Sequence, residues 1–266
     1  MSTPMNAAAL RLFDVARLGR LEFESGGDAA AQVGVVIPLY NYGSLIEECL
    51  RSLLDQDLPR FAVTVIDDAS QDDGRARAIA LLHRWSSRFS RVRVVRHVRN
   101  QGLSMARNSG IAWSLEPYLF MLDADNRLRP PALSRLLEAL EASGAPFVYS
   151  QLRLFGDVSG VGVADIWEPE RLRKGNYIDA MALIRRDVLV AMKGYAVLAD
   201  DHGWEDYDLW CRFAAAGLQG VFLPEVLCDY RVHGTSMLRT QTNRHFDALM
   251  AEMALRHPAL FNPVED

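Results

Sequence analysis

An unbroken apolar run, Tyr118–Leu122, ends in two carboxylates that lie one residue apart, Asp123 and Asp125. A run of this length suits a strand covered on both faces of a parallel sheet, and ligands of open α/β sheets bind beyond the carboxyl ends of such strands. Side chains two residues apart on an extended chain point the same way, so the two acids can converge on one divalent cation. The alternative is a turn in which the acids only cap the following segment, ahead of Pro130 and Pro131.

The segments around this run alternate between strand-like and helix-like patterns. Val33–Ile37 is a β-branched run stopped by Pro38, and Ser44 then introduces apolar residues at helical spacing. Similar patterns predict strands at 61–66, 92–95, 118–122, 147–152 and 177–184, and helices at 70–89, 105–113, from 130 and at 205–216. Repeated strand–helix–strand crossovers predict an α/β fold with a mixed, mostly parallel, doubly wound central sheet and helices on both faces.

Composition bounds the class of protein. The chain has 266 residues, 50% of them hydrophobic, which is enough for one large core. Its net charge of −5 argues against a nucleic-acid partner, and the arginine-rich run Arg84–Arg99 is interpreted as a solvated surface. Three cysteines far apart, without zinc or disulfide spacing, favour a reducing, cytoplasmic location. No apolar run is long enough to span a bilayer.

The N-terminal segment is predicted to be separate from the sheet. Leu10, Phe13, Arg17 and Leu21 stand at helical spacing, and Gly26–Asp28 then breaks the pattern. This predicts a helix over 8–21 and a linker. Packing of the helix on its own domain is favoured, and an amphipathic helix at a membrane surface or on a partner is the alternative, so peripheral membrane association stays open.

The first strand-to-helix connection, Pro38–Gly43, lacks both the Gly-x-Gly-x-x-Gly of dinucleotide folds and the Gly-x-x-x-x-Gly-Lys of phosphate loops. A bound diphosphate would need another counter-charge, such as a cation held at Asp125. Asp67 and Asp68 end the second predicted strand at the same edge, where one of them could accept a hydrogen bond from a nucleobase imide. The competing interpretation is an acidic N-cap for the helix after Ser70.

Five motifs add up to a resemblance. In chain order they are Val36–Asn41, Ile66–Ser70, Asn100–Asn108, Leu122–Asp125 and Trp204–Trp210. Together they resemble the motifs of family 2 glycosyltransferases, which have the GT-A (Rossmann-like) fold. The resemblance implies inverting transfer of a sugar from a nucleotide diphosphate sugar to an acceptor hydroxyl, assisted by Mn²⁺ or Mg²⁺.

The resemblance also implies a domain organisation. It places a single catalytic domain at 33–236, with a nucleotide-binding half at 33–125 and an acceptor-binding half at 126–236. A helical extension and linker at 1–32 precedes this domain, and a helical extension at 237–266 follows it.

The resemblance further implies roles for individual residues on the donor side. Pro38, Tyr40 and Asp68 would hold the base and ribose, with Asp68 accepting the uracil N–H, so a UDP-sugar is expected. Arg107 would lie near the nucleotide, and a solvated helix arginine is the alternative. Asp123 would face the ribose or the sugar.

The metal site is expected at Asp125 and at His233, which follows a Tyr-Arg pair as in many relatives. The alternative for His233 is an ordinary satisfied or exposed loop histidine.

Asp206 is the candidate general base implied by the resemblance, the carboxylate that takes the proton from the incoming hydroxyl. The structural alternative is that Glu205 and Asp206 only complement the dipole of the helix they begin, which would also keep the carboxylate ionised. The chain lacks the Gln-x-x-Arg-Trp motif of processive synthases, so a single transfer is expected. The acceptor could be a glycan, a lipid-linked sugar or a protein. A nucleotidyltransferase and a non-catalytic binding module of the same fold remain as alternatives.

Overall fold

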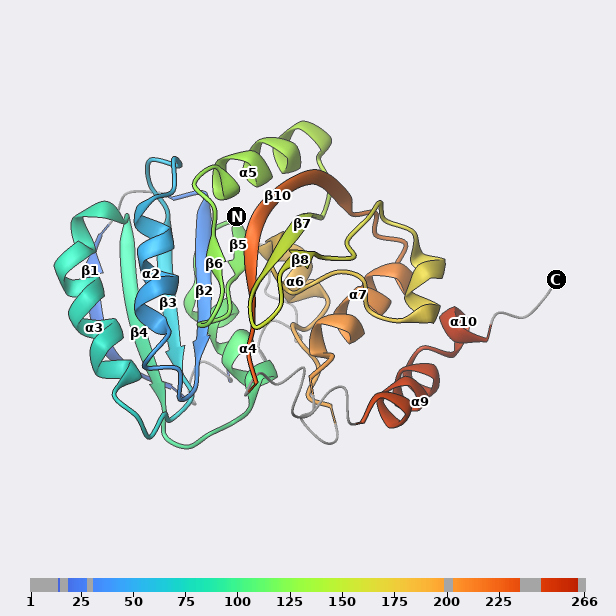
Figure 1. Ribbon diagram of the computed structural model, residues 1–266, viewed down its shortest axis with the longest axis horizontal. Coiled ribbons are helices and arrows are strands. Elements are labelled where there is room, and N and C mark those ends of the chain that lie inside the picture. The colour runs from blue at the N-terminus through green and yellow to red at the C-terminus, as the bar shows by residue number, and fades with distance from the viewer. Residues whose placement is uncertain (1–13, 15–18, 28–30, 199–202, 235–244, 263–266) are drawn as a thin grey trace, which may run out of the picture.

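The computed structural model describes residues 14, 19–27, 31–198, 203–234 and 245–262. In these residues one mixed sheet of ten strands has the order β1-β4-β3-β2-β5-β9-β7-β10-β6, and β8 pairs with β7 (Figure 1). The central strands β4, β3, β2 and β5 are parallel, as are β7 and β10. The strands are β1 (Gly19–Gly26), β2 (Val33–Leu39), β3 (Ala62–Asp67), β4 (Arg91–His97), β5 (Tyr118–Met121), β6 (Arg127–Leu128), β7 (Phe147–Gly156), β8 (Gly160–Val161), β9 (Ala182–Arg185) and β10 (Val221–Val232).

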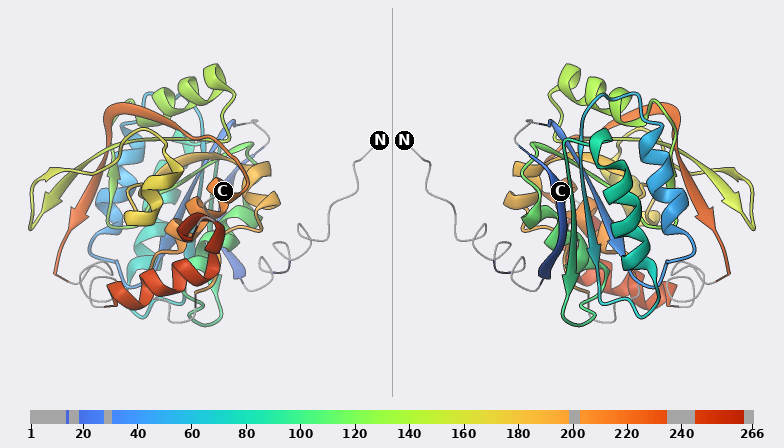
Figure 2. Two further views of the ribbon diagram at one scale, coloured as in Figure 1. Left: turned by 90° about the vertical axis from the view of Figure 1, so that its right-hand side faces the viewer. Right: turned by 90° about the vertical axis from the view of Figure 1, so that its left-hand side faces the viewer.

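Helices cover both faces of this sheet (Figures 1 and 2). The α-helices are α2 (Ile46–Leu54), α3 (Gly74–Trp85), α4 (Leu103–Trp113), α5 (Ala132–Ser143), α6 (Arg186–Ala191), α7 (Glu205–Ala215), α9 (Phe246–Arg256) and α10 (Pro258–Phe261). Two 3₁₀ helices, η1 (Ser86–Arg88) and η2 (Pro169–Lys174), complete the elements. None of the helices in the described ranges is long and apolar enough to cross a membrane.

Strand β2 shows why the centre of the sheet is apolar on both sides. Val35 and Ile37 pack into the core that contains apolar residues of α2, α3 and α5, whereas Val36 between them packs into the core of α4 and α7. Alternate side chains of a strand point to opposite faces, so a strand with helices on both faces needs a continuous apolar run. The predicted mixed, mostly parallel sheet of the GT-A fold is confirmed.

The predicted N-terminal helix is wrong over residues 19–21, although the described residue 14 is helical. Residues 19–21 belong to β1, the edge strand that pairs antiparallel with β4, and not to a helix. Leu21 and Phe23 alternate with charged residues, which is the pattern of a half-exposed edge strand. The rest of the predicted helix, except residue 14, lies outside the described residues, as does part of the predicted linker.

Two further differences lie in the second half of the chain. Strand β10 follows α7 and was not predicted, because its residues lack clear apolar alternation. The predicted strand at 177–184 begins only at Ala182, since the segment before it is irregular. The C-terminal helices α9 and α10 pack on the core, through Leu249 and Met253 of α9 among others.

Close packing of α4 on β2 gives a testable expectation. A Cβ added at Gly110 would overlap the side chain of Val36, so Gly110→Ala should lower the free energy of unfolding by about 1–3 kcal/mol. This loss should appear although alanine favours helix over glycine by about 1 kcal/mol. Denaturant unfolding measures the effect, and adding Val36→Ala to the same chain should recover part of it. A stabilised Gly110→Ala protein would contradict this packing.

Candidate active site

The two acids after β5 lie at the carboxyl edge of the sheet. Leu122 donates its backbone N–H to the Val36 carbonyl at 2.9 Å and so prolongs the contact between β5 and β2. The chain then turns, and Asn126 donates its backbone N–H to the Asp123 carbonyl at 3.0 Å. The backbone therefore forms a turn, and the carboxylates of Asp123 and Asp125 meet different side chains, Arg107 and His233. Convergence of the two acids on one cation stays a prediction.

Asp125 meets His233, which comes directly after β10. The Oδ2 atom of Asp125 and the Nε2 atom of His233 are 3.0 Å apart, although the residues are 108 positions apart in the chain. The ring of Tyr42 lies edge-on to the imidazole, with 5.8 Å between ring centroids. Burial and the negative charge of Asp123 raise the pKa of Asp125, and the hydrogen bond from His233 opposes this rise. The structure thus brings together the two residues expected to share a cation.

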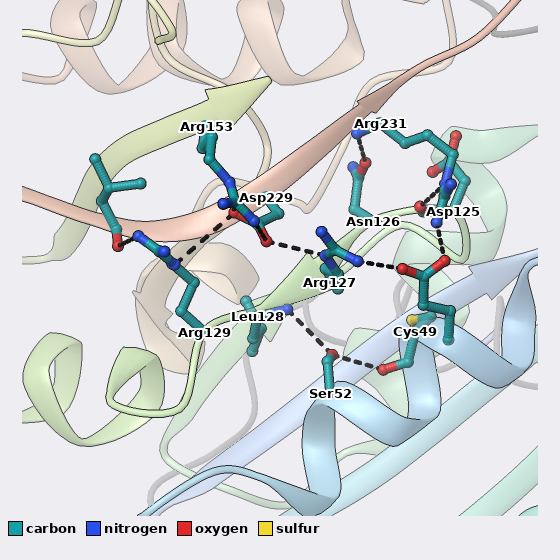
Figure 3. Close-up of polar contacts among 12 residues, drawn as sticks. Cys49, Ser52, Asp125, Asn126, Arg127, Leu128, Arg129, Arg153, Asp229 and Arg231 are labelled. Carbon is teal, nitrogen blue, oxygen red and sulfur yellow. Dashed lines mark hydrogen bonds and ion pairs between the residues drawn. The ribbon is translucent and has the colours of Figure 1, made fainter. Parts of the chain in front are cut away.

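Arg231, two residues before His233, is bonded to the turn that holds Asp125 (Figure 3). Its backbone N–H donates to Oδ1 of Asn126 at 2.8 Å, and its Nε donates to the Asp125 carbonyl at 2.9 Å. Its guanidinium also pairs with Glu48 of α2. These bonds tie the end of β10 to the turn after β5, so the contact between Asp125 and His233 does not depend on a free loop.

The separation of Asp125 Oδ2 and His233 Nε2 fits a shared divalent cation. Ligand bonds of about 2.1 Å to neighbouring positions around an octahedral ion put the ligand atoms about 3 Å apart. In the ranges that the structure describes, His, Cys, Asp and Glu form no cluster of three that could hold a metal.

Arg107 of α4 is buried between two carboxylates. Its Nη2 donates to Oδ1 of Asp123 at 2.7 Å, and its Nη1 pairs with Oε1 of Glu205 at the start of α7. The side chain is only 2% exposed, so the interpretation as a solvated helix arginine is wrong. Burial opposes the charge of Arg107, and the two acids beside it more than offset burial and raise its pKa. Arg107 thereby links the acids after β5 to the acids of α7.

Asn108, the next residue in the sequence, holds Tyr195 beside Arg107. Asn108 donates from Nδ2 to the Tyr195 carbonyl at 2.8 Å and accepts the Tyr195 backbone N–H at 2.7 Å. The Tyr195 ring then lies 5.3 Å from the Arg107 guanidinium carbon. In the described structure the Nε of Arg107 and the hydroxyl of Tyr195 are buried without a hydrogen-bond partner. Two unsatisfied donors beside the acids suit a site that a polar ligand completes.

Asp206 lies in the first turn of α7, next to Glu205. Its Oδ2 accepts a hydrogen bond from Nδ2 of Asn176 at 3.1 Å, and its Oδ1 accepts the backbone N–H of Tyr207 at 2.7 Å. Burial raises its pKa to about 8, helped by the charges of Glu205 and Asp179, while Arg107 opposes the rise. The expectation that the helix dipole keeps this carboxylate ionised is therefore wrong, because burial and like charges outweigh the dipole.

Asp179 is a member of the site that the sequence reasoning missed. Burial raises its pKa to about 7, and the charge of Asp123 adds to the rise. Its Oδ1 accepts the backbone N–H of Met181 at 2.9 Å. The signal available in the sequence was an acidic residue inside the predicted strand 177–184, close to Asn176.

Asp208 has a different role from its neighbours on α7. Its carboxylate is fully buried and accepts hydrogen bonds from Arg212, Arg256 and His257, at 2.7, 2.8 and 3.0 Å. The hydrogen bond from His257 and the charge of Arg212 hold its pKa well below the usual range. Asp208 thus anchors α7 to the C-terminal helices.

The predicted nucleotide residues lie at the ends of β2 and β3. Pro38 is buried within β2, and Tyr40 just beyond it is 43% exposed. Asp68 is buried, and its Oδ1 lies 2.6 Å from Nδ1 of His97 and accepts the Gln101 backbone N–H at 2.8 Å.

The structure rules out one interpretation of the acids at the end of β3. Oδ2 of Asp68 accepts the backbone N–H of Gly102 at 2.8 Å, so Asp68 organises the loop that begins α4. The N-cap of α3 is Asp73, so the prediction that Asp67 or Asp68 caps this helix is wrong. A carboxylate has about four acceptor positions, so Asp68 with three bonds keeps one for a ligand. Whether that ligand is a nucleobase stays a prediction.

Comparison with known proteins identifies the family to which the chain belongs. The model of the family Glycosyl transferase family 2 matches residues 34–200. The succinoglycan biosynthesis protein ExoO of Rhizobium meliloti is 32% identical over 253 residues, which cover 88% of this chain and 70% of ExoO. The putative teichuronic acid biosynthesis glycosyltransferase TuaG of Bacillus subtilis is 25% identical, over 77% of this chain and 81% of TuaG. The chain aligns with only 30% of the uncharacterized glycosyltransferase EpsJ of the same organism, at 34% identity.

Solved structures share the fold. TarS of S. aureus, residues 1–349 in complex with UDP-GlcNAc, superposes with a TM-score of 0.70 at 16% identity, over 88% of this chain and 68% of that one. The mannosyltransferase PcManGT of Pyrobaculum calidifontis, in complex with GDP-Man and Mn²⁺, gives a TM-score of 0.61 at 20% identity, over 95% and 75%. With the family match over more than half of the chain, the conclusion is that this protein belongs to glycosyl transferase family 2.

Proposed function

We propose that the chain is a cation-assisted, inverting glycosyltransferase that moves a sugar from a UDP-sugar to an acceptor hydroxyl. The observation that carries the proposal is the buried Arg107 bridge, which joins Asp123 to Glu205. Asp123 is next but one to Asp125, and Glu205 is next to Asp206. One rigid link therefore relates the pair that would bind the donor to the carboxylate that would activate the acceptor, and such fixed geometry is what a displacement in one step needs.

On the donor side, Asp125 and His233 would hold Mn²⁺ or Mg²⁺. Bound there, the cation would neutralise the diphosphate and stabilise it as a leaving group. The first strand-to-helix connection, Pro38–Gly43, lacks a glycine-rich phosphate loop, so it offers no evident substitute for the charge of the cation. Pro38, Tyr40 and Asp68 would hold the base and ribose, and Asp123 would face the ribose or the sugar.

On the acceptor side, Asp206 would accept the proton of the attacking hydroxyl. A general base works best with a pKa near the operating pH, and the raised pKa of about 8 puts Asp206 in that range. Asn176 donates to Oδ2 and so orients the carboxylate. Attack from the face opposite the diphosphate would invert the anomeric centre.

The acceptor is proposed to be a glycan, a lipid-linked sugar or a protein. The names of relatives favour cell-surface polymers, since ExoO is a succinoglycan biosynthesis protein and TarP of Staphylococcus aureus is a poly(ribitol-phosphate) β-N-acetylglucosaminyltransferase. The structural neighbours bind UDP-GlcNAc in one case and GDP-Man in the other, and guanine offers a ring N–H to Asp68 as uracil does, so the choice of uridine rests on the family resemblance. A cytoplasmic location is part of the proposal, because Cys49, Cys211 and Cys228 are all buried and unpaired.

The donor site predicts a cation-dependent response to nucleotide. UDP at about a hundred times its Kd should raise the melting temperature by roughly 5–10 °C with Mn²⁺, and much less with a chelator. Asp125→Ala should remove the cation-dependent part, and His233→Ala should reduce it less, because the charge pairing remains. Thermal melts with UDP, GDP and dTDP measure this, and His83→Ala on α3 is the control. Equal shifts in chelator would rule out the cation role.

The base assignment predicts separate effects on turnover and stability. Asp206→Asn should lower kcat by roughly a hundredfold or more, and wild-type kcat/KM should fall as pH drops below about 8. The pKa of the folded-state carboxyl is raised from 3.8 to about 8, so ionisation opposes folding and stability is lost as pH rises through that window. Asp206→Asn should therefore melt no lower than wild type at pH 9.

Nucleoside diphosphate release and thermal melts on the same samples measure both effects of Asp206→Asn. Glu205→Gln serves as the neighbouring comparison and should reduce kcat less. Wild-type turnover in Asp206→Asn would rule out the base assignment, whatever the melting temperature.

The Arg107 bridge predicts a large loss of stability when it is broken. Arg107→Met leaves the partly exposed Asp123 and the buried Glu205 without their shared counter-charge and should cost about 3–5 kcal/mol. Adding Asp123→Asn and Glu205→Gln should recover much of that loss. Denaturant unfolding at neutral pH measures it, and Arg77→Met, which removes an exposed pair with Asp73 on α3, should cost under about 1 kcal/mol. Equal losses at both arginines would contradict the role of the bridge.

A further inference from the structure

A row of side chains outside the active site crosses four neighbouring strands. Val161 of β8 pairs with Arg153 of β7. Arg153 in turn pairs with Asp229 of β10, and Asp229 pairs with Arg127 of β6. Residues paired across neighbouring strands lie on the same face of a sheet, so these four side chains share one face.

This face carries an excess of positive charge (Figure 3). The buried carboxylate of Asp229 accepts hydrogen bonds from Arg127 at 2.9 Å and from Arg153 at 2.8 and 2.6 Å. Arg129 lies 4.0 Å from the same carboxylate. Glu48 is the second acid of the group and pairs with Arg127 and Arg231. We call this group the cationic face: the arginines 127, 129, 153 and 231 around the acids 48 and 229.

The arginines of the cationic face are held in place and not merely solvated. Two guanidinium groups pack on the ring of Phe155. The ring centroid lies 4.0 Å from the guanidinium carbon of Arg127 and 4.4 Å from that of Arg231. Arg129 and Arg153 still expose 40% and 43% of their side chains. Four arginines against two acids leave a surplus of two positive charges on a chain whose net charge is −5. The face can therefore attract anions although the whole protein cannot.

Apolar side chains are exposed beside the cationic face. Val158, Val161, Val163 and Ile166 expose 42%, 61%, 72% and 57% of their surface. They lie within nine consecutive residues, whereas the other exposed large apolar residues of the described structure are scattered along the chain. The outer part of β7, the turn to β8 and the end of β10 project from the body of the molecule (Figure 2).

We infer that the β7–β8 hairpin and the cationic face dock the protein on an anionic lipid bilayer. Exposed apolar side chains next to arginines match the two layers of such a surface, because the apolar groups enter the acyl boundary and the guanidiniums bind lipid phosphates. The hairpin segment also carries Asp157 and Asp165, and Asp165 is paired with Arg171 at 2.8 Å. A soluble polyanion would use the arginines alone and would leave the valines without a role.

The docking surface begins beside the site proposed for the donor. Arg231, which belongs to the cationic face, donates its Nε to the Asp125 carbonyl. Docking would therefore bring the active-site edge close to the lipid headgroups, where a lipid-linked acceptor presents its hydroxyl. The inference itself does not rest on the transfer reaction, because membrane binding is measured without donor or acceptor and can succeed or fail independently of turnover.

Sedimentation with vesicles tests the docking. The full chain should bind vesicles of phosphatidylcholine with phosphatidylglycerol, should bind phosphatidylcholine alone far more weakly, and should be released by high salt. Absence of binding to the anionic vesicles would overturn the inference. Binding to polyphosphate but not to vesicles would assign the cationic face to a soluble anionic ligand and would also overturn it.

Variants locate the surface. The pair Val161→Asp and Val163→Asp should reduce binding to anionic vesicles about tenfold or more, and Arg129→Gln should reduce it about fivefold. Leu255→Asp on α9 and Arg77→Gln on α3 change equally exposed residues elsewhere and should leave binding unchanged. Binding that survives the hairpin variants would place the membrane contact elsewhere in the chain and would overturn the inference.

A spin label gives a readout that does not depend on affinity. The three native cysteines are buried, so a nitroxide attached to Val163→Cys labels the hairpin selectively. On anionic vesicles its relaxation should become more sensitive to oxygen and less sensitive to a water-soluble nickel complex. The same label at Leu255→Cys should stay accessible to nickel, and equal nickel accessibility at both positions would contradict docking through the hairpin.

Discussion

The arrangement of the active site depends on one buried guanidinium, that of Arg107. Its two ends bind Asp123 after β5 and Glu205 at the start of α7, which lie in different halves of the chain. The planar fork of arginine suits this bridge, because a lysine ammonium is a point charge that cannot pair with two separate carboxylates in fixed geometry. Asn108, the next residue, holds the Tyr195 backbone through two hydrogen bonds. One turn of α4 therefore positions Asp123 and Glu205 through Arg107, and Tyr195 through Asn108.

Local sequence patterns predicted the central strands and the acids at their ends, because burial on both faces forces continuous apolar runs there. The contact of Asp125 with His233 was predicted only through the family resemblance, since no local pattern reports a contact across 108 positions. Arg107 illustrates what a pattern cannot supply. A lone arginine on a helix is usually solvated, and only the packing of α4 against two loops buries it. The same limit applies to β1, an edge strand whose partner strand is not specified by its own residues.

The raised pKa values of Asp179 and Asp206 mean that ionising these two groups destabilises the fold. Asp179 and Asp206 reach about 7 and about 8 because burial and like charges disfavour their ionised forms. Asp208, two residues further on α7, shows the opposite effect, since Arg212, Arg256 and His257 lower its pKa. Helix α7 is therefore anchored by Asp208, whose ionised form is stabilised, and carries Asp206, whose ionised form is destabilised, in the candidate site. A carboxylate whose pKa lies near neutral pH can both accept a proton and release it again. A carboxylate with a very low pKa cannot do this efficiently.

The balance of charge in the site bears on how a diphosphate could enter it. Asp123, Asp125, Asp179 and Asp206 interact electrostatically: the charge of Asp123 raises the pKa of Asp125 and of Asp179, and the charge of Asp179 raises the pKa of Asp206. Arg107 is shared between Asp123 and Glu205, so it leaves no surplus positive charge for an anionic donor. A nucleotide diphosphate arriving alone would therefore meet like charges in a poorly solvated site, which is costly. A divalent cation beside Asp125 would offset part of this negative charge, so the acid-rich site favours donor and cation binding together.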